Sequence, residues 1–140
     1  GIEVLHHSEY IDRLISEKKL DISGTDLRYA YHDPCELGRG CGIYEEPRNV
    51  VSAVGVLVEG AKSGKESICC GGSLGSLSLA EEHRRKITES ALSNLTAESP
   101  DAVVTACPLC KNTFNRYAAV PVLDIAEIVA QAIRRNNIKQ

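Results

Sequence analysis

The spacing of the cysteines constrains this chain more than any other feature of its sequence. Cys69 and Cys70 are adjacent and are followed directly by two glycines. Cys35 precedes this pair, and a C-x2-C unit formed by Cys107 and Cys110 follows it. Five cysteines therefore fall on the pattern C-x33-C-C-x36-C-x2-C. Thiols grouped in this way are typical of sites that a fold gathers around a metal centre.

The adjacent pair favours a metal centre over a disulfide. Neighbouring cysteines rarely bond to each other, because the small ring that they would close strains the peptide between them. Two adjacent thiols suit a site where both sulfurs face one centre, and the following glycines permit positive φ and a close backbone approach. Five sulfurs exceed the four ligands of tetrahedral zinc, which favours a cluster.

Composition limits the function classes. At 140 residues, with 43% hydrophobic and 25% charged residues, the chain can form one α/β domain with its own core. The net charge of −3 and the 4% aromatic content argue against a nucleic-acid surface. No apolar run approaches the roughly 20 residues of a membrane span, and residues 1–5 lack the features of a signal peptide. We therefore expect no membrane span and no signal peptide here.

The residues alone leave three interpretations of the six cysteines open: a metal or cluster site, a secreted disulfide scaffold, and reduced structural cysteines. A chain with a sufficient core does not need disulfides, and the spacing fits metal ligation better. Reduced thiols would indicate the cytoplasm.

Strand and helix signals alternate along the chain, which predicts an α/β fold with a mainly parallel sheet flanked by helices. Strands are expected at residues 2–5, 27–31, 56–59, 102–106 and 120–123, with a short extended segment at 65–68. Helices are expected at about 8–20, from 47 onward, at 79–97, at 109–117 and from 125 until the chain frays at about 134. Ser8 and Asp124 are expected to cap their helices, and residues 78–81 match a capping box.

This fold would gather the cysteines at one rim. Cys35, the Cys69–Cys70 pair and Cys107 each come directly after a predicted strand or extended segment. Ligands of parallel sheets collect outside the carboxyl ends of the strands, so we expect all five thiols there. Helices beginning near Ser78 and Pro108 would point their positive ends at the same rim.

Five segments of the sequence form a recognisable set: YHDPC (31–35), LGRG (37–40), IYEEPR (43–48), CCGG (69–72) and CPLC (107–110). Together they resemble a known family, the cysteine-rich CCG domain. This domain occurs in heterodisulfide reductase, in the iron–sulfur subunit of glycolate oxidase and in lactate-utilisation proteins.

The resemblance implies a cofactor and its ligands. Cys35, Cys69, Cys70, Cys107 and Cys110 would hold a noncubane [4Fe–4S] cluster, used for electron transfer or for disulfide reduction of the heterodisulfide reductase kind. Some CCG domains bind zinc instead, so a structural zinc module on four of these thiols is the alternative. A thioredoxin-like exchanger at the C-x2-C unit would leave the other three cysteines unexplained.

The resemblance also implies a larger assembly. Residues 1–140 would form a single CCG domain, the C-terminal one of a longer iron–sulfur oxidoreductase. Its partners would be an N-terminal CCG domain, a ferredoxin-like domain or separate redox subunits. The expected location is the cytoplasm, with any membrane association made through partner subunits.

Departures from the family pattern concern the surroundings of the centre. Glu36 stands where a histidine is common, and Ser73 follows the paired glycines where a further glycine is usual. Cys41 lies outside the five-cysteine frame, and we expect that it is not a ligand.

Charged and imidazole groups beside the frame are expected mainly to close loops. These groups are His32, Asp33, Arg39 and Arg48, with a supporting role at the centre as the alternative for His32 and Arg39. His6 and His7 are expected at a strand-to-helix corner.

Overall fold

The computed structural model describes the backbone over residues 1–138 and the side chains over residues 1–133. Helices and strands alternate along it. Their order is α1 (His7–Ser16), β1 (Arg28–His32), α2 (Glu45–Val54), β2 (Val56–Val58), α3 (Glu81–Leu95), β3 (Ala102–Thr105), α4 (Pro108–Asn115), β4 (Val122–Asp124) and α5 (Ile125–Ile138). Short turns of helix lie between them at Glu36–Gly40, Gly64–Glu66 and Leu74–Ser76.

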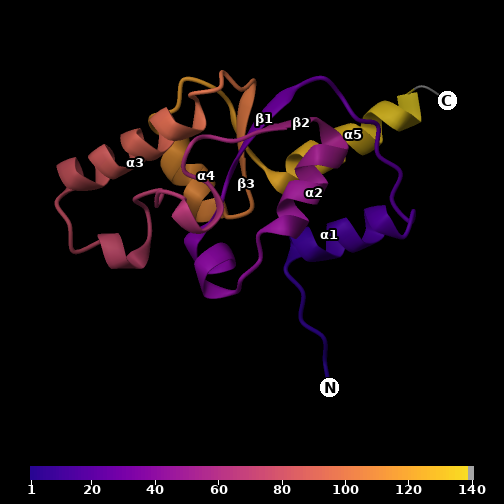
Figure 1. Ribbon diagram of the computed structural model, residues 1–140, viewed down its shortest axis with the longest axis horizontal. Helices are drawn as coiled ribbons and strands as arrows, with labels where there is room; N and C mark the ends of the chain where they lie inside the picture. The colour runs from indigo at the N-terminus through magenta and orange to yellow at the C-terminus, as the bar shows by residue number, and fades with distance from the viewer. Residues whose placement is uncertain (139–140) are drawn as a thin grey trace.

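The four strands form one sheet in the order β2-β1-β3-β4, and every neighbouring pair is parallel. The predicted parallel α/β fold is confirmed. The chain passes from β1 to β2 on one side and then returns across β1 to β3 on the other (Figure 1). The strand order therefore reverses between β1 and β3, which is where ligands of such sheets bind.

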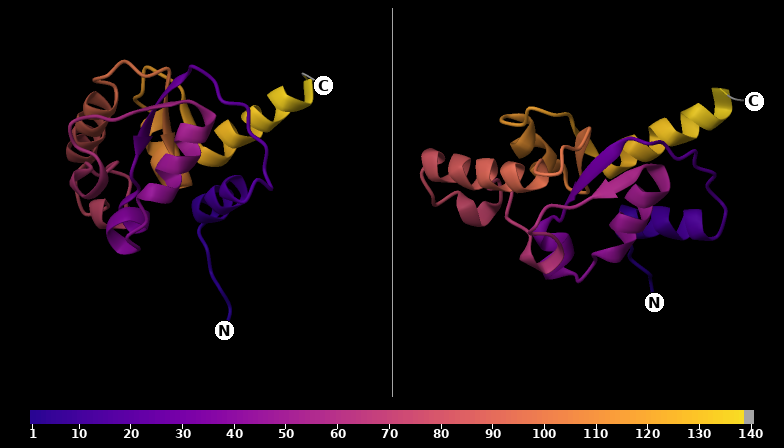
Figure 2. Two further views of the ribbon diagram at one scale, coloured as in Figure 1. Left: turned by 45° about the vertical axis from the view of Figure 1, so that its right-hand side comes forward. Right: turned by 45° about the horizontal axis from the view of Figure 1, so that its top comes forward.

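Helices cover both faces of the sheet. Tyr29 and Tyr31 of β1 belong to the core under α1, α2 and α5, whereas Ala30 belongs to the core under α3 and α4. Successive strand residues point to opposite faces, so one strand serves both cores. The views in Figures 1 and 2 agree on this three-layer arrangement. Val50, Val51 and Val54 of α2 are fully buried in the first of these cores.

The N-terminal predictions need correction. Residues 2–5 form no strand, and the side chains of Ile2 and Val4 are 94% and 87% exposed. A strand forms only where it finds a neighbour, and this segment lies beside none. The first helix is capped by His6 rather than by Ser8: the His6 ring accepts a hydrogen bond from the Ser8 amide, and the His6 amide donates to Glu9 at 2.8 Å.

The segment before the paired cysteines is also different from its prediction. Gly64–Glu66 forms a turn of 3₁₀-helix, with φ of +58° at Gly64, instead of an extended segment. The Gly64 amide donates to the Asp33 carboxylate at 2.7 Å, which ties this turn to the end of β1. The paired cysteines therefore follow a loop and not a strand.

Of the remaining helix ends, two need correction and one is as predicted. The third helix begins at Glu81 without a side-chain cap, because the Ser78 hydroxyl donates to the Gly75 carbonyl instead. Asp124 does cap the last helix, accepting from the Ala126 amide at 2.8 Å. That helix continues to Ile138, so the prediction that the chain frays from about residue 134 is wrong for residues 134–138. Residues 139–140 lie outside the described part.

Candidate metal centre

The first and last cysteine groups leave two neighbouring strands. Cys35 lies three residues beyond the end of β1, and Cys107 lies two residues beyond the end of β3. These strands pair with His32 opposite Thr105. Both cysteines therefore lie at the rim where the strand order reverses, as the sequence predicts.

A pocket of about 390 Å³ lies at this rim. Its lining includes the side chains of Cys35, Cys70, Cys107 and Cys110. The fifth cysteine, Cys69, is the chain neighbour of Cys70, and its sulfur accepts a hydrogen bond from the Gly71 amide. The structure thus brings the five framed cysteines together, four around one pocket and one directly beside it.

Cys41 lies apart from this group. Its side chain is exposed, and it lines an adjoining pocket of about 300 Å³ together with Cys107. This position agrees with the expectation that Cys41 is not a ligand, which stays a prediction.

The paired cysteines are positioned by their glycines. Gly71 has φ of +84°, which side-chain-bearing residues rarely adopt. A Cβ atom on Gly72 would collide with the Thr113 side chain of α4, and one on Gly71 would collide with Thr88 of α3. Thr88 also donates to the Cys70 carbonyl at 2.7 Å. The glycines therefore let this loop fit tightly between two helices, which fixes the direction of both thiols.

Backbone amides face the two sulfurs. The Gly71 amide donates to the Cys69 sulfur and the Gly72 amide to the Cys70 sulfur, each at 3.4 Å. Such amides stabilise the charge on thiolates and on a cluster that thiolates hold.

The C-x2-C unit lies on the start of α4. Cys107 is the N-cap residue, Pro108 is the first residue of the helix, and Cys110 lies in its first turn. The partial positive charge of a helix N-terminus favours thiolates there. The predicted second helix end at Ser78 does not reach the rim, because α3 begins at Glu81 and no residue from 78 to 81 lines the cysteine pocket.

The thiols of the paired cysteines, Cys69 and Cys70, hold their protons more tightly than ordinary thiols. The hydrogen bond with Cys110, with burial, raises the pKa of Cys70 to about 11. The hydrogen bond with Cys70 and burial likewise raise the pKa of Cys69. A metal centre must displace these protons, so its binding depends on pH. Because it holds both sulfurs, its binding free energy also stabilises the loop that carries Cys69 and Cys70.

A buried ion pair fastens the loops around the pocket. The Arg48 guanidinium donates to both carboxylate oxygens of Asp33, at 2.7 and 2.8 Å, and to Glu59 at 2.6 Å. The hydrogen bonds that Arg48 donates to Asp33 raise the pKa of Arg48. Arg39 donates to the Ser67 carbonyl at 3.0 Å, joining the turn after Cys35 to the loop before Cys69. The predicted loop-closing role of these side chains is confirmed.

His32 is the site residue that sequence reasoning placed least well. It ends β1 on the face opposite Tyr31, with its ring edge against Phe114 at a centroid distance of 4.7 Å. Burial lowers the pKa of His32 to about 4, so the ring is neutral at physiological pH. Side chains along β1 point alternately to the two faces of the sheet, so the sequence indicates that His32 and Tyr31 face opposite ways. It does not indicate which helices cover each face.

The donor set fits an iron–sulfur cluster or zinc. All five groups are soft sulfur donors, which are the ligands that iron–sulfur clusters and zinc prefer. Carboxylate ligands typical of magnesium or calcium are few at this pocket, where Glu36 is the one carboxylate among the described lining residues.

Comparison with known families decides the relationship. A family model for the cysteine-rich domain CCG matches residues 29–115, a range that contains all five framed cysteines. The chain belongs to the CCG family of cysteine-rich domains. The resemblance noted in the sequence is thereby confirmed.

Curated relatives of this CCG domain are redox proteins. A probable membrane-anchored ferredoxin of Chromohalobacter salexigens is 38% identical over 93% of this chain and 21% of its own length. An EtfAB:quinone oxidoreductase of Syntrophomonas wolfei is 32% identical over 94% of this chain and 21% of its length. One subunit of the dihydromethanophenazine:CoB–CoM heterodisulfide reductase of Methanosarcina acetivorans is 32% identical over 94% of this chain and 34% of its length.

The CCG domain therefore spans about a fifth to a third of these relatives. Within residues 1–138, no helix combines the length and the apolar character needed to cross a membrane.

Proposed function

We propose that this CCG domain holds a [4Fe–4S] cluster on Cys35, Cys69, Cys70, Cys107 and Cys110, and transfers electrons within a larger iron–sulfur oxidoreductase. The observation that carries the proposal is the gathering of five thiols at the reversal point of a parallel sheet. Zinc does not use five thiolates and has no redox chemistry. The relatives named as a ferredoxin, a quinone oxidoreductase and a heterodisulfide reductase component support an electron-transfer role.

The protein's own groups would set the properties of the centre. When bound, a [4Fe–4S] cluster supplies one-electron transfer. The amides of Gly71 and Gly72 would donate to ligand sulfurs and raise the reduction potential. The side chains of Leu74 and Leu109 line the same pocket and would limit the access of water.

The larger protein would supply the electron partners. We include in the proposal a second CCG domain, a ferredoxin-like domain or a separate redox subunit, because the relatives extend far beyond the matched region. Disulfide reduction of the heterodisulfide reductase kind is the finer form of the proposal, and it rests on the relationship to the Methanosarcina acetivorans protein.

A structural zinc module is the second candidate. Four cysteines line the pocket, and four is the number of ligands that zinc takes in structural sites. In this form Cys69 or Cys70 would be dispensable, and the domain would stabilise an assembly without redox chemistry.

Anaerobic reconstitution separates the two candidates. Protein treated with iron and sulfide should turn brown and give a paramagnetic signal that appears and disappears reversibly on oxidation or reduction. Each of the five cysteine-to-alanine variants should weaken or abolish that signal. If the protein takes up one zinc per chain, forms no cluster and tolerates loss of Cys69 or Cys70, the zinc module is correct.

A further inference from the structure

A buried imidazole lies against the cysteines of the centre. The side chain of His32 is 2% exposed, and those of Cys70 and Cys110 are each 3% exposed. One ring nitrogen of His32 and the two sulfurs all lie within 4.8 Å of one another. The three groups come from β1, from the glycine loop and from α4, so the fold rather than local sequence brings them together.

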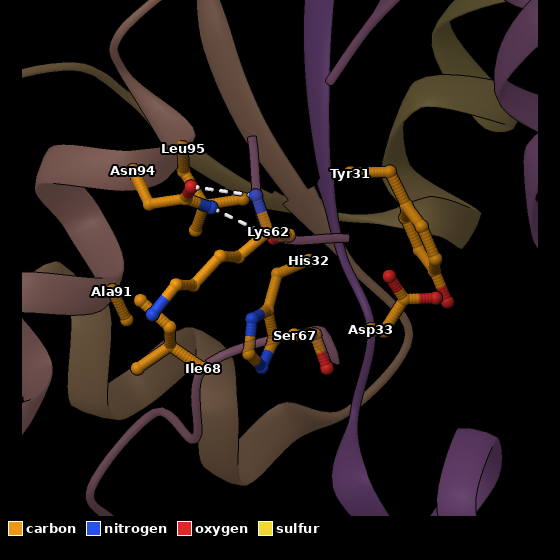
Figure 3. A pocket seen from close by; sticks show the side chains of 9 residues that line it. All are labelled: Tyr31, His32, Asp33, Lys62, Ser67, Ile68, Ala91, Asn94 and Leu95. Carbon is orange, nitrogen blue, oxygen red and sulfur yellow. Dashed lines mark hydrogen bonds between the residues drawn. The ribbon is translucent and has the colours of Figure 1, made fainter. Parts of the chain in front are cut away.

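The position of the ring is enforced by its surroundings. Figure 3 shows the imidazole on the side of β1 that faces Ser67 and Ile68, away from Tyr31 and Asp33. The cavity beside it measures only about 10 Å³. Phe114 holds another edge of the ring. The imidazole is therefore enclosed by protein and kept beside the thiols.

One nitrogen of this ring has no partner. The Nε2 atom of His32 is buried and makes no hydrogen bond within the part of the chain that the structure describes. A buried polar atom without a hydrogen-bond partner lowers the stability of the fold by about 1–3 kcal/mol. We therefore expect this nitrogen to gain a partner in the functional state.

The sulfur of Cys110 is the group that most needs a donor. The sulfurs of Cys69 and Cys70 each accept a backbone amide, from Gly71 and Gly72. Among residues 1–133, no amide donates to the Cys110 sulfur, whose polar neighbours are the Cys70 sulfur and a ring nitrogen of His32. Metal ligation requires deprotonated thiols, so the Cys70 sulfur would have no proton to donate. Cys110 would then be a buried acceptor without a donor.

We propose that His32 donates its Nε2 proton to the sulfur of Cys110, or to the facing sulfur of Cys70, when these residues hold the proposed cluster. His32 is then a positioning residue that raises the reduction potential, because a hydrogen bond to sulfur stabilises the more negatively charged reduced state. It is not a further ligand, since the five-cysteine frame already supplies the protein donors. The inference rests on the proposed function.

The test compares two replacements of the ring in anaerobically reconstituted protein. His32→Phe keeps an aromatic ring against Phe114 but removes the donor, whereas His32→Gln keeps an amide donor. We expect His32→Phe to form the cluster with a lower midpoint potential and His32→Gln to recover most of the difference. Tyr31→Phe is the matched control, because it also removes a buried polar atom without a partner, from the opposite face of the same strand. The control should leave the potential unchanged.

A spectroscopic readout of the wild-type protein stays informative even where a variant does not fold. Wild-type protein labelled with ¹⁵N-histidine should show a weak nitrogen coupling to the electron spin of the cluster, and His32→Phe should lose it. A strong coupling, as from nitrogen bound to iron, would overturn the inference by making His32 a ligand. An unchanged potential in His32→Phe, with no nitrogen coupling in the wild type, would overturn it while leaving the cluster intact. Failure of the wild-type chain to form any cluster would instead overturn the proposed function, and this inference with it.

Discussion

Removal of the Asp33 carboxylate should destabilise the whole domain. Asp33 is 2% exposed and accepts three hydrogen bonds, two from the Arg48 guanidinium and one from the Gly64 amide. Asp33→Asn keeps the size of the side chain but removes its charge and turns an NH₂ group toward one donor. Breaking a buried ion pair from one side costs about 3–5 kcal/mol. Arg48 keeps its contact with Glu59, so we expect the lower end, about 3 kcal/mol.

Urea unfolding of the reduced, metal-free protein, followed by far-ultraviolet circular dichroism, measures this loss. At this chain length 3 kcal/mol corresponds to a fall in the melting temperature of roughly 10 °C. Release of the Gly64 amide should also loosen the loop before Cys69, so a thiol reagent should modify that cysteine faster.

The matched control is another two-point contact between arginine and a carboxylate, at the surface. Arg13 donates to both oxygens of Glu3, at 3.0 and 2.7 Å, with both side chains exposed. Exposed pairs contribute little, so Glu3→Gln should leave the urea midpoint unchanged. If Asp33→Asn also lowered the free energy of unfolding by less than about 1 kcal/mol, burial would not be what makes loss of the Asp33–Arg48 pair costly. That result would refute the argument.

Three further predictions concern the cysteine loop and the core. Cys41→Ala should leave the iron content of reconstituted protein unchanged while Cys69→Ala lowers it; an equal loss in both would place Cys41 among the ligands. Gly72→Ala should cost about 1–3 kcal/mol through its collision with the Thr113 side chain. Thr113→Ala in the same chain should restore part of that stability in urea unfolding, and no recovery would contradict the collision. Ile128→Ala should cost about 2–5 kcal/mol because Ile128 is fully buried, and a loss below about 1 kcal/mol would show that the core collapses around the gap.

The successful predictions rest on patterns that extend over many residues, such as the alternation of strands and helices. An apolar run such as residues 102–104 fits a strand buried on both faces, and it lies in β3, one of the two interior strands of the sheet. Alternation of strands and helices specifies a parallel sheet, and that sheet places Cys35 and Cys107 at one rim. These inferences needed no local detail, because the carboxyl ends of parallel strands meet at one edge.

The predictions that failed depended on neighbours that a sequence does not display. Residues 2–5 have strand-forming side chains but no adjacent strand. Ser78 matches a capping box, yet its hydroxyl is taken by the Gly75 carbonyl. The segment expected to be extended at 65–68 begins instead within a 3₁₀ turn, which the Gly64 amide ties to Asp33 across the fold. The orientation of His32 follows from which face of β1 is covered by α4, and only the three-dimensional structure shows that.

The reversal of strand order between β1 and β3 has a consequence for how the centre is assembled in a cell. During synthesis β1 and Cys35 leave the ribosome before the other parts of the pocket, and β2 and α3 must follow before β3 and its cysteines emerge. The strand that completes the rim is therefore among the last parts of the pocket to be made. Until α4 docks, Cys35, Cys69 and Cys70 are present as unshielded thiols without their final partners. Loading of the proposed cluster would then follow translation of most of the domain, and the nascent thiols would have to stay reduced throughout that interval.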